Sequence, residues 1–158
     1  MSLDDWILSL HVLSAFALVA AEVAFTIMIV ALWRSDSPAR VAGMMRVGQL
    51  GMVLVMAGMA GTLIFGIWLA ISLDAYQLWD GWVIAALILW ALGGFLGQKT
   101  GEGYNAGGEL AGKLSAEGVT SSPELAETFG PSRVFWLHNA TLVVVLAILV
   151  VMIWKPGA

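Results

Sequence analysis

The first long apolar segment, residues 6–33, places the strongest constraint on what this chain can fold into. It reads WILSLHVLSAFALVAAEVAFTIMIVALW, in which His11 and Glu22 are the only ionisable side chains. At a rise of about 1.5 Å per residue, the segment is long enough to cross a hydrocarbon core of about 30 Å. The sequence therefore predicts a membrane-spanning helix that carries two polar side chains unsuited to lipid.

These two side chains share one face of the predicted helix. His11 and Glu22 are eleven positions apart in the sequence, which at about 100° per residue brings them within about 20° of each other. Ser14 and Thr26 lie on or beside the same stripe, so we expect this face to look into a helix bundle. A carboxyl group at mid-membrane costs several kcal/mol unless it is protonated, paired or hydrated, which makes Glu22 a candidate proton or ion site. The alternative is a protonated Glu22 that only hydrogen-bonds to a neighbouring helix.

The composition indicates a membrane protein as well. Of the 158 residues, 60% are hydrophobic and 11% charged, which is unlike a soluble domain of this size. Asp4 and Asp5 precede the first apolar segment, where a cleaved signal peptide would have basic residues. The chain has no cysteine, so any metal would need histidine, methionine or carboxylate ligands. The net charge of −4 and the lack of a basic stripe argue against a nucleic-acid partner.

Three further apolar segments follow, and together with the first they predict an all-α fold. We expect helices at about 6–33, 39–73, 78–97 and 133–154, within a single four-helix membrane domain that covers residues 1–158. A short connection is predicted at residues 74–80. The glycines before Lys99 suggest that the third helix ends there, and that residues 99–132 form a polar loop containing at most short helices.

The basic residues predict the orientation. Six of the seven lie in the connections that follow the first and third helices or in the helix turns that adjoin them, and only Lys155 lies on the opposite side; the six are Arg34, Arg40, Arg46, Lys99, Lys113 and Arg133. By the positive-inside rule, these connections face the cytoplasm and both termini face outward. We therefore expect the chain to cross a lipid bilayer four times, with both termini on the outer side.

The second helix is rich in small residues. Gly51, Gly58 and Gly61 would permit close approach of another backbone. We expect this face to pack either within the bundle or across a subunit interface, in a homo-oligomer or a larger membrane complex. Met52 belongs to a methionine face of the same helix, and such a face is more often adaptable core than a set of ligands.

The histidines are the candidate ligands for a cofactor. His11 should lie in the outer part of the first helix and His138 in the inner part of the fourth, about 15 Å apart along the membrane normal, which is too far for one haem iron or one metal ion. Each could instead have its own site. The candidate partners are Ser14 and Asp80 for His11, and Asn139, Gln49 and Met52 for His138. A histidine and methionine pair suits haem b or copper; the alternative is an ordinary core histidine.

Three stretches carry a resemblance to a known family. LHVLSA in the first helix, GTLIFGIWLA in the second and WDGWVIAALILW at the start of the third resemble a bacterial family catalogued as a predicted integral membrane protein with a domain of unknown function. This resemblance covers roughly residues 6–99 and implies a four-helix protein of the bacterial inner membrane, without an established reaction.

A more distant resemblance rests on LHVLSA alone. It is similar to the start of the copper-resistance CopD-like membrane proteins and of haem-associated four-helix membrane proteins. The chain departs from the CopD-like pattern at Ala20, Ala21 and Glu22, where those proteins usually have a stretch of the type Trp-x-Gly-Gly.

Three functions of different classes remain open from the sequence. The first is a membrane protein that binds haem b or a metal for electron transfer or metal handling, with His11 and His138 as candidate ligands. The second is a small proton-coupled transporter that uses Glu22, with a protonatable line from His11 through Glu22 toward His138. The third is a structural subunit of a respiratory or photosynthetic assembly that docks through the glycines of the second helix. No serine elbow, zinc-protease motif or phosphate loop is present, which argues against an ordinary enzyme.

Overall fold

The computed structural model describes residues 2–73, 77–130 and 132–156. In these ranges the chain forms five α-helices and no β-strand, which confirms the all-α prediction. The helices are α1 (Leu3–Trp33), α2 (Pro38–Ser72), α3 (Gly81–Ala116), α4 (Pro123–Phe129) and α5 (Arg133–Trp154). Four segments are long and apolar enough to cross a membrane, namely α1, α2, α3 and the segment that ends with α5.

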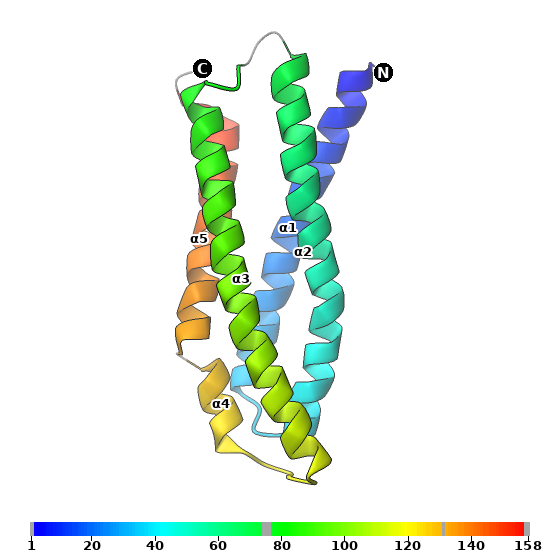
Figure 1. Ribbon diagram of the computed structural model, residues 1–158, viewed down its shortest axis with the longest axis vertical. Coiled ribbons are helices and arrows are strands. Elements are labelled where there is room, and N and C mark those ends of the chain that lie inside the picture. Colours follow the sequence, from blue (N-terminus) through cyan, green and yellow to red (C-terminus); the bar gives the residue numbers. More distant parts are fainter. Residues whose placement is uncertain (1, 74–76, 131, 157–158) are drawn as a thin grey trace.

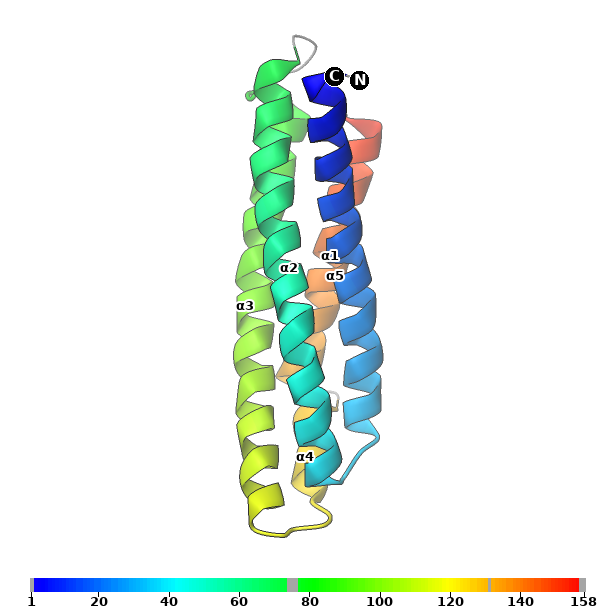
Figure 2. The ribbon, with the colours of Figure 1, turned by 90° about the vertical axis from the view of Figure 1, so that its right-hand side faces the viewer.

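The four long helices run side by side along the long axis of the molecule (Figures 1 and 2). α1 packs most extensively on α2, α3 packs most extensively on α5, and α2 joins the two pairs by packing on α3. The start of α1 and the end of α5 lie at one end, which we call the terminal end (Figure 1). The short helix α4 lies at the opposite end, beside the connection between α1 and α2, and we call this the α4 end.

Local hydrogen bonds explain where the first helices begin. α1 starts three residues earlier than predicted because Ser2 and Asp5 form a reciprocal cap: the Asp5 N–H donates to the Ser2 hydroxyl at 3.2 Å, and the Ser2 N–H donates to the Asp5 carboxylate at 2.7 Å. α2 starts at Pro38, whose fixed φ suits the first helical position. In the predicted connection at 74–80, residues 74–76 lie outside the described part of the chain, and α3 begins directly after Asp80.

The prediction that the third helix ends near Lys99 is wrong, since α3 continues to Ala116. The predicted polar loop at 99–132 is therefore mostly helical, with α4 as a second helix within it. Helix propensity alone disfavours this segment because of its glycines. The glycines instead let neighbouring side chains approach α3: a Cβ at Gly103 or Gly107 would collide with Val134 or Phe129. Tertiary packing thus outweighs the weak local preference.

The α4 end contains the aliphatic and aromatic core of the molecule. Its buried side chains come from α1, α2, α3 and α4, and we call them the α4-end core: Ile29, Leu32, Val41, Tyr104, Ala111, Leu125 and Phe129. α2 and α3 have 35 and 36 residues, so each is about 50 Å long and extends about 20 Å beyond a hydrocarbon core. The charged segments at this end lie on that extension, which indicates that the α4-end core is surrounded largely by water.

The middle of the bundle is organised in the opposite way. Large apolar side chains there point outward, as shown by the exposed fractions of Phe16 (67%), Val53 (67%) and Ile64 (57%). An outward apolar surface of this extent is expected where the solvent is lipid. The long helices therefore place their apolar surface against the bilayer and keep their few polar side chains inside.

Candidate functional site

A carboxyl group and an imidazole face each other inside the bundle. Glu22 on α1 and His138 on α5 are only 8% and 4% exposed. The Glu22 Oε2 atom lies 3.8 Å from the His138 Nδ1 atom. This separation is longer than a hydrogen bond, and a small movement of the carboxyl group would close it. The structure therefore brings together the buried acid of the first helix and the histidine of the last.

Thr26 fixes the other side of the imidazole. Its Oγ1 atom lies 2.9 Å from the His138 Nε2 atom and donates to the Glu22 backbone carbonyl at 2.8 Å. A threonine hydroxyl has one proton to donate, so with that proton on the carbonyl, the His138 Nε2–H must donate to Thr26. The Nδ1 atom then presents a lone pair to the Glu22 carboxyl group. The contact between these two groups is attractive only when a proton lies between them.

A third helix contributes a phenol. Tyr104 of α3 is buried, and its ring stacks between Phe25 and Phe129 at centroid distances of 6.3 and 6.1 Å. Its hydroxyl lies within electrostatic reach of Glu22. In the described part of the chain, neither this hydroxyl nor the Glu22 Oε2 atom has a hydrogen-bond partner. Buried polar atoms without partners are uncommon, and a role in proton or redox chemistry is one of the explanations for them.

A cavity of about 180 Å³ lies between α1, α2 and α3, next to this group. It is lined by apolar and polar side chains from all three helices: Phe25, Met28, Met45, Gly48, Gln49, Met52, Tyr104 and Asn105. The amides of Gln49 and Asn105 make part of the wall hydrophilic. Tyr104 is the residue that this wall shares with the group described above, because its hydroxyl is the one on which the charge of Glu22 acts.

The remaining predicted polar residues lie elsewhere. His11 packs against Gly66 of α2, near the backbone of Thr62, and it precedes Thr26 by a distance of about 22 Å along α1. The Asp80 carboxylate accepts the Gln77 N–H at 2.9 Å, just before α3 begins. The Asn139 amide donates to the Phe135 carbonyl at 2.8 Å. The structure therefore keeps the two histidines at different levels.

Met52 packs between α2 and α3. Its methyl group lies 3.7 Å from the position of a Cβ on Gly101. Met45 and Met59, seven residues away on either side, contact Gly108 and Gly94 in the same way. His138 instead contacts α1. In the described ranges, no group of three or more histidine, aspartate or glutamate side chains is arranged to hold a metal ion.

The predicted glycine face of α2 packs on α1 within the bundle. A Cβ at Gly58 would lie 2.8 Å from the Leu18 Cγ atom, and a Cβ at Gly61 would overlap the Ser14 hydroxyl. Gly51 contacts the Phe25 ring. The polar stripe of α1 is therefore divided: its Ser14 end meets the glycines of α2, and its Glu22 end meets α5.

With this geometry described, comparison with known proteins places the chain in a family. The family model described as "Predicted integral membrane protein (DUF2269)" matches residues 5–156. The chain belongs to this family. The match reaches well beyond residue 99, where the resemblance seen in the sequence ended. Searches of curated proteins and of solved structures found no match, and no comparison shows the likeness to the CopD-like proteins.

For this member of the family, sequence reasoning missed Tyr104 and Asn105. Both fall in the segment that was predicted to be a loop, so neither was considered as part of the site around Glu22. A signal was present in the spacing of five of the residues that the structure buries on α3, namely Gly93, Thr100, Tyr104, Gly107 and Ala111. Intervals of seven, four, three and four residues are those of one helix face.

Proposed function

We propose that this protein is a proton-coupled membrane transporter in which Glu22 and His138 form the proton-binding centre. The observation that carries the proposal is the buried approach of the Glu22 Oε2 atom to the His138 Nδ1 atom at 3.8 Å. Placing a carboxyl group and an imidazole inside a membrane costs free energy unless the two groups share a proton. Such groups usually belong to proton relays or ion pathways. Thr26 supports the proposal because it orients the imidazole toward the acid.

The chemistry is a reversible transfer of one proton. When Glu22 is protonated and His138 is neutral, the O–H bond of the carboxyl group can break as an N–H bond forms at Nδ1, which leaves a carboxylate beside an imidazolium. Both states carry the same net charge, and the attraction between the carboxylate and the imidazolium offsets part of the desolvation cost of forming the two charges. A cationic substrate that takes the place of the proton beside the Glu22 carboxylate would couple its own movement to proton movement.

The cavity beside Tyr104 is the proposed route between this pair and water. Gln49 and Asn105 provide hydrogen-bonding groups on its wall, and we assign the step between that wall and Glu22 to the Tyr104 hydroxyl. A phenol can accept one proton while it donates another, so it can pass a proton without changing its own charge. Tyr104→Phe removes this hydroxyl and keeps the stacked ring, and we expect it to slow proton exchange while the fold is preserved.

Proton movement can be measured directly in sealed vesicles. Wild-type protein in vesicles that contain a pH-sensitive dye should dissipate an imposed pH gradient faster than empty vesicles when choline, a membrane-impermeant organic cation, is supplied on one side, and Glu22→Gln should abolish the difference. The amide still forms hydrogen bonds, so the variant should fold. Glu109→Gln removes an exposed carboxylate of α3 and serves as the matched control. Equal rates for wild type and Glu22→Gln would contradict the proposal.

The proposed membrane is the bacterial inner membrane, with the α4 end in the cytoplasm, as the basic residues favour. Glu117 at the α4 end and Gln77 before α3 are both exposed, so a cysteine at either position would be accessible to a reagent on its own side. In intact cells, an impermeant thiol reagent should label a cysteine at 77 and spare one at 117. The reverse pattern would overturn this orientation.

Binding of haem b or copper remains a second candidate, and one observation favours it. The His11 Nδ1 atom is buried beside Gly66 of α2 and makes no close hydrogen bond to a side chain in the described part of the chain, where the backbone of Thr62 is the polar group that acts on the ring. His138 fits a metal less well, since a ligand bond from either ring nitrogen would displace Thr26 or Glu22. An absorption spectrum and metal analysis of the detergent-purified protein test this function. A haem band that His11→Ala removes would support it, and a colourless, metal-free protein after expression with haem and copper would exclude it.

A further inference from the structure

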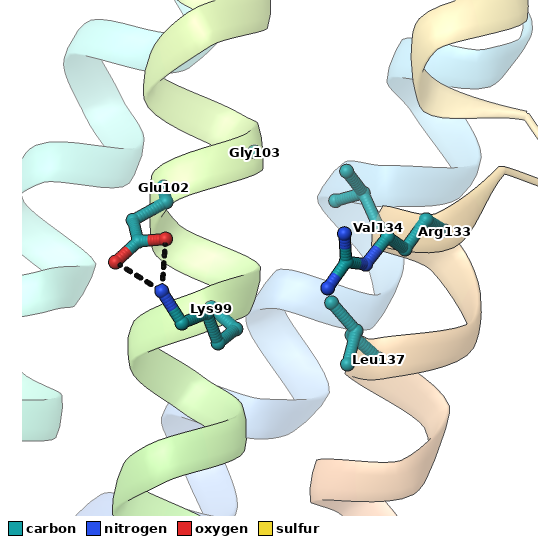
Figure 3. A pocket seen from close by; sticks show the side chains of 6 residues that line it. All are labelled: Lys99, Glu102, Gly103, Arg133, Val134 and Leu137. Atoms are coloured by element: carbon teal, nitrogen blue, oxygen red, sulfur yellow. Dashed lines mark hydrogen bonds and ion pairs between the residues drawn. The ribbon is translucent and has the colours of Figure 1, made fainter.

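A second cavity, of about 260 Å³, lies between α3 and α5 toward the α4 end. Its six lining residues are Lys99, Glu102, Gly103, Arg133, Val134 and Leu137 (Figure 3). None of them lines the cavity beside Tyr104. The cavity therefore combines two cationic side chains with an apolar wall, and it is separate from the proposed proton site.

Arg133 is the cation available to a ligand. Its guanidinium group extends from α5 toward α3 (Figure 3), and no hydrogen bond or ion pair from it is recorded in the described ranges. Lys99 instead folds onto Glu102, whose two carboxylate oxygens accept its amino group at 3.0 and 2.7 Å. A guanidinium group is a planar fork that matches the oxygens of a phosphate. Arg133 is thus free to bind an anion, and Lys99 could do so only after its ion pair with Glu102 is broken.

The apolar part of the wall continues from these cations along α5. Val134 and Leu137 form it, and Gly103 lets Val134 lie directly against α3, because a Cβ at that position would collide with it. Trp136 on the same turn of α5 is 66% exposed. Exposed tryptophans mark the level at which lipid headgroups meet acyl chains. The cationic part of the cavity therefore lies near headgroup level, with the apolar part next to it.

We propose that this cavity binds an anionic phospholipid, with Arg133 on the headgroup phosphate and the first part of an acyl chain along Val134 and Leu137. Basic pockets between membrane helices on the cytoplasmic side suit such headgroups. Glu102 limits the affinity, because it occupies Lys99 and adds a negative charge near the phosphate. Inorganic phosphate would meet the same cations but would gain nothing from the apolar wall.

The test measures lipid binding to the full-length protein in neutral detergent by native mass spectrometry. Phosphatidylglycerol is the probe, and phosphatidylcholine and inorganic phosphate are compared with it. Arg133→Gln should raise the Kd for phosphatidylglycerol by at least about fivefold, which corresponds to about 1 kcal/mol per basic residue. Glu102→Gln should lower the Kd because it releases Lys99. Arg46→Gln removes an exposed cation of α2 outside the cavity and should change little.

The opposite signs of the two substitutions keep the proposal falsifiable if one variant is unstable. A loss of fold could mimic the effect of Arg133→Gln, but it could not produce tighter binding in Glu102→Gln. Equal Kd values for wild type and both variants would overturn the proposal. Inorganic phosphate that binds with the same Kd as phosphatidylglycerol would also overturn it, because the ligand would then be a free phosphate.

Discussion

The α4 end and the middle of the bundle are held together in different ways. The large side chains that are fully buried come from the α4 end: Phe129, Ile29, Leu32, Leu125 and Val41. In the middle, side chains of comparable size such as Phe16 and Ile64 point outward. The inner contacts there are made by glycines and by polar pairs, as Gly58 against Leu18 and Thr26 against His138 illustrate.

The difference follows from the solvent. Where water surrounds the protein, burial of apolar surface stabilises the fold by about 25 cal/mol per Å². In lipid, an apolar side chain gains nothing comparable by moving inside, so close packing over small residues and interhelical hydrogen bonds provide the stability. The chain therefore contains two kinds of core. The α4-end core is stabilised by burial of apolar surface from water, which we call a water-type core, and the middle of the bundle is stabilised by close packing and interhelical hydrogen bonds. Substitutions in the two regions should therefore change the free energy of unfolding differently.

Truncation of a large side chain should have the largest effect, and only at the α4 end. Phe129→Ala leaves a cavity in a water-type core and should lower the free energy of unfolding by about 3–5 kcal/mol. Phe16→Ala removes the same atoms from a lipid-facing position and should change it by less than about 0.5 kcal/mol. Denaturant unfolding of both variants in micelles measures this difference. Similar losses would show that the two regions do not differ as described.

Enlargement of a small residue should have the next largest effect, and only inside the bundle. At Gly58 an added Cβ would lie 2.8 Å from the Leu18 Cγ atom and 3.0 Å from the Ser14 carbonyl oxygen. Gly58→Ala should therefore destabilise the protein by about 1–3 kcal/mol. Gly43→Ala also lies in α2 but meets nothing within 4 Å, so the better helix propensity of alanine should stabilise it by up to about 1 kcal/mol. Melting temperatures that shift in the same direction would contradict this packing.

The smallest effect is expected in the connections at the α4 end. The Ser121 hydroxyl, which donates to the exposed Asp36 carboxylate at 2.7 Å, lowers the pKa of that carboxyl below its ordinary 3.8, with help from the Asp36 backbone and from Arg40. A lowered pKa in the folded state means that the contact stabilises the protein above the ordinary value and is lost as the pH falls below it. Ser121→Ala should raise the pKa of Asp36 in a nuclear magnetic resonance titration. Thr120→Ala, at an exposed neighbouring position, should leave it unchanged.

Most of the fold could be predicted from the sequence because the bilayer leaves few alternatives. Apolar length alone indicated the four spans, and the stripe with His11 and Glu22 indicated which side of α1 faces inward. The end of α3 could not be predicted in the same way. Its glycines lower the local helix propensity, but they also let neighbouring helices pack closely against α3. Met45, Met52 and Met59 recur at the same interval as Gly108, Gly101 and Gly94, the glycines that they contact, and this matching periodicity was the missed signal.

The candidate site could be predicted only in part. Glu22 was identifiable from its depth, and His138 as a polar residue on the side of Glu22 that was predicted to be cytoplasmic. Their direct approach depends on how α5 is rotated against α1, which a sequence pattern does not specify. Tyr104 was missed for a different reason, since its position in a buried helix face follows from the continuation of α3.

Infrared titration of the Glu22 carboxyl group tests the central claim most directly. Protein reconstituted in lipid should show a protonated-carboxyl band that Glu22→Gln removes and that changes in intensity within the range from about pH 4 to about pH 10, where carboxyl and imidazole groups titrate. His138→Gln should displace that change along the pH axis, because it removes the group that exchanges the proton. A Glu22 band that stays constant over the whole range, or one that is indifferent to His138→Gln, would contradict a shared proton and leave the pair as a packing contact.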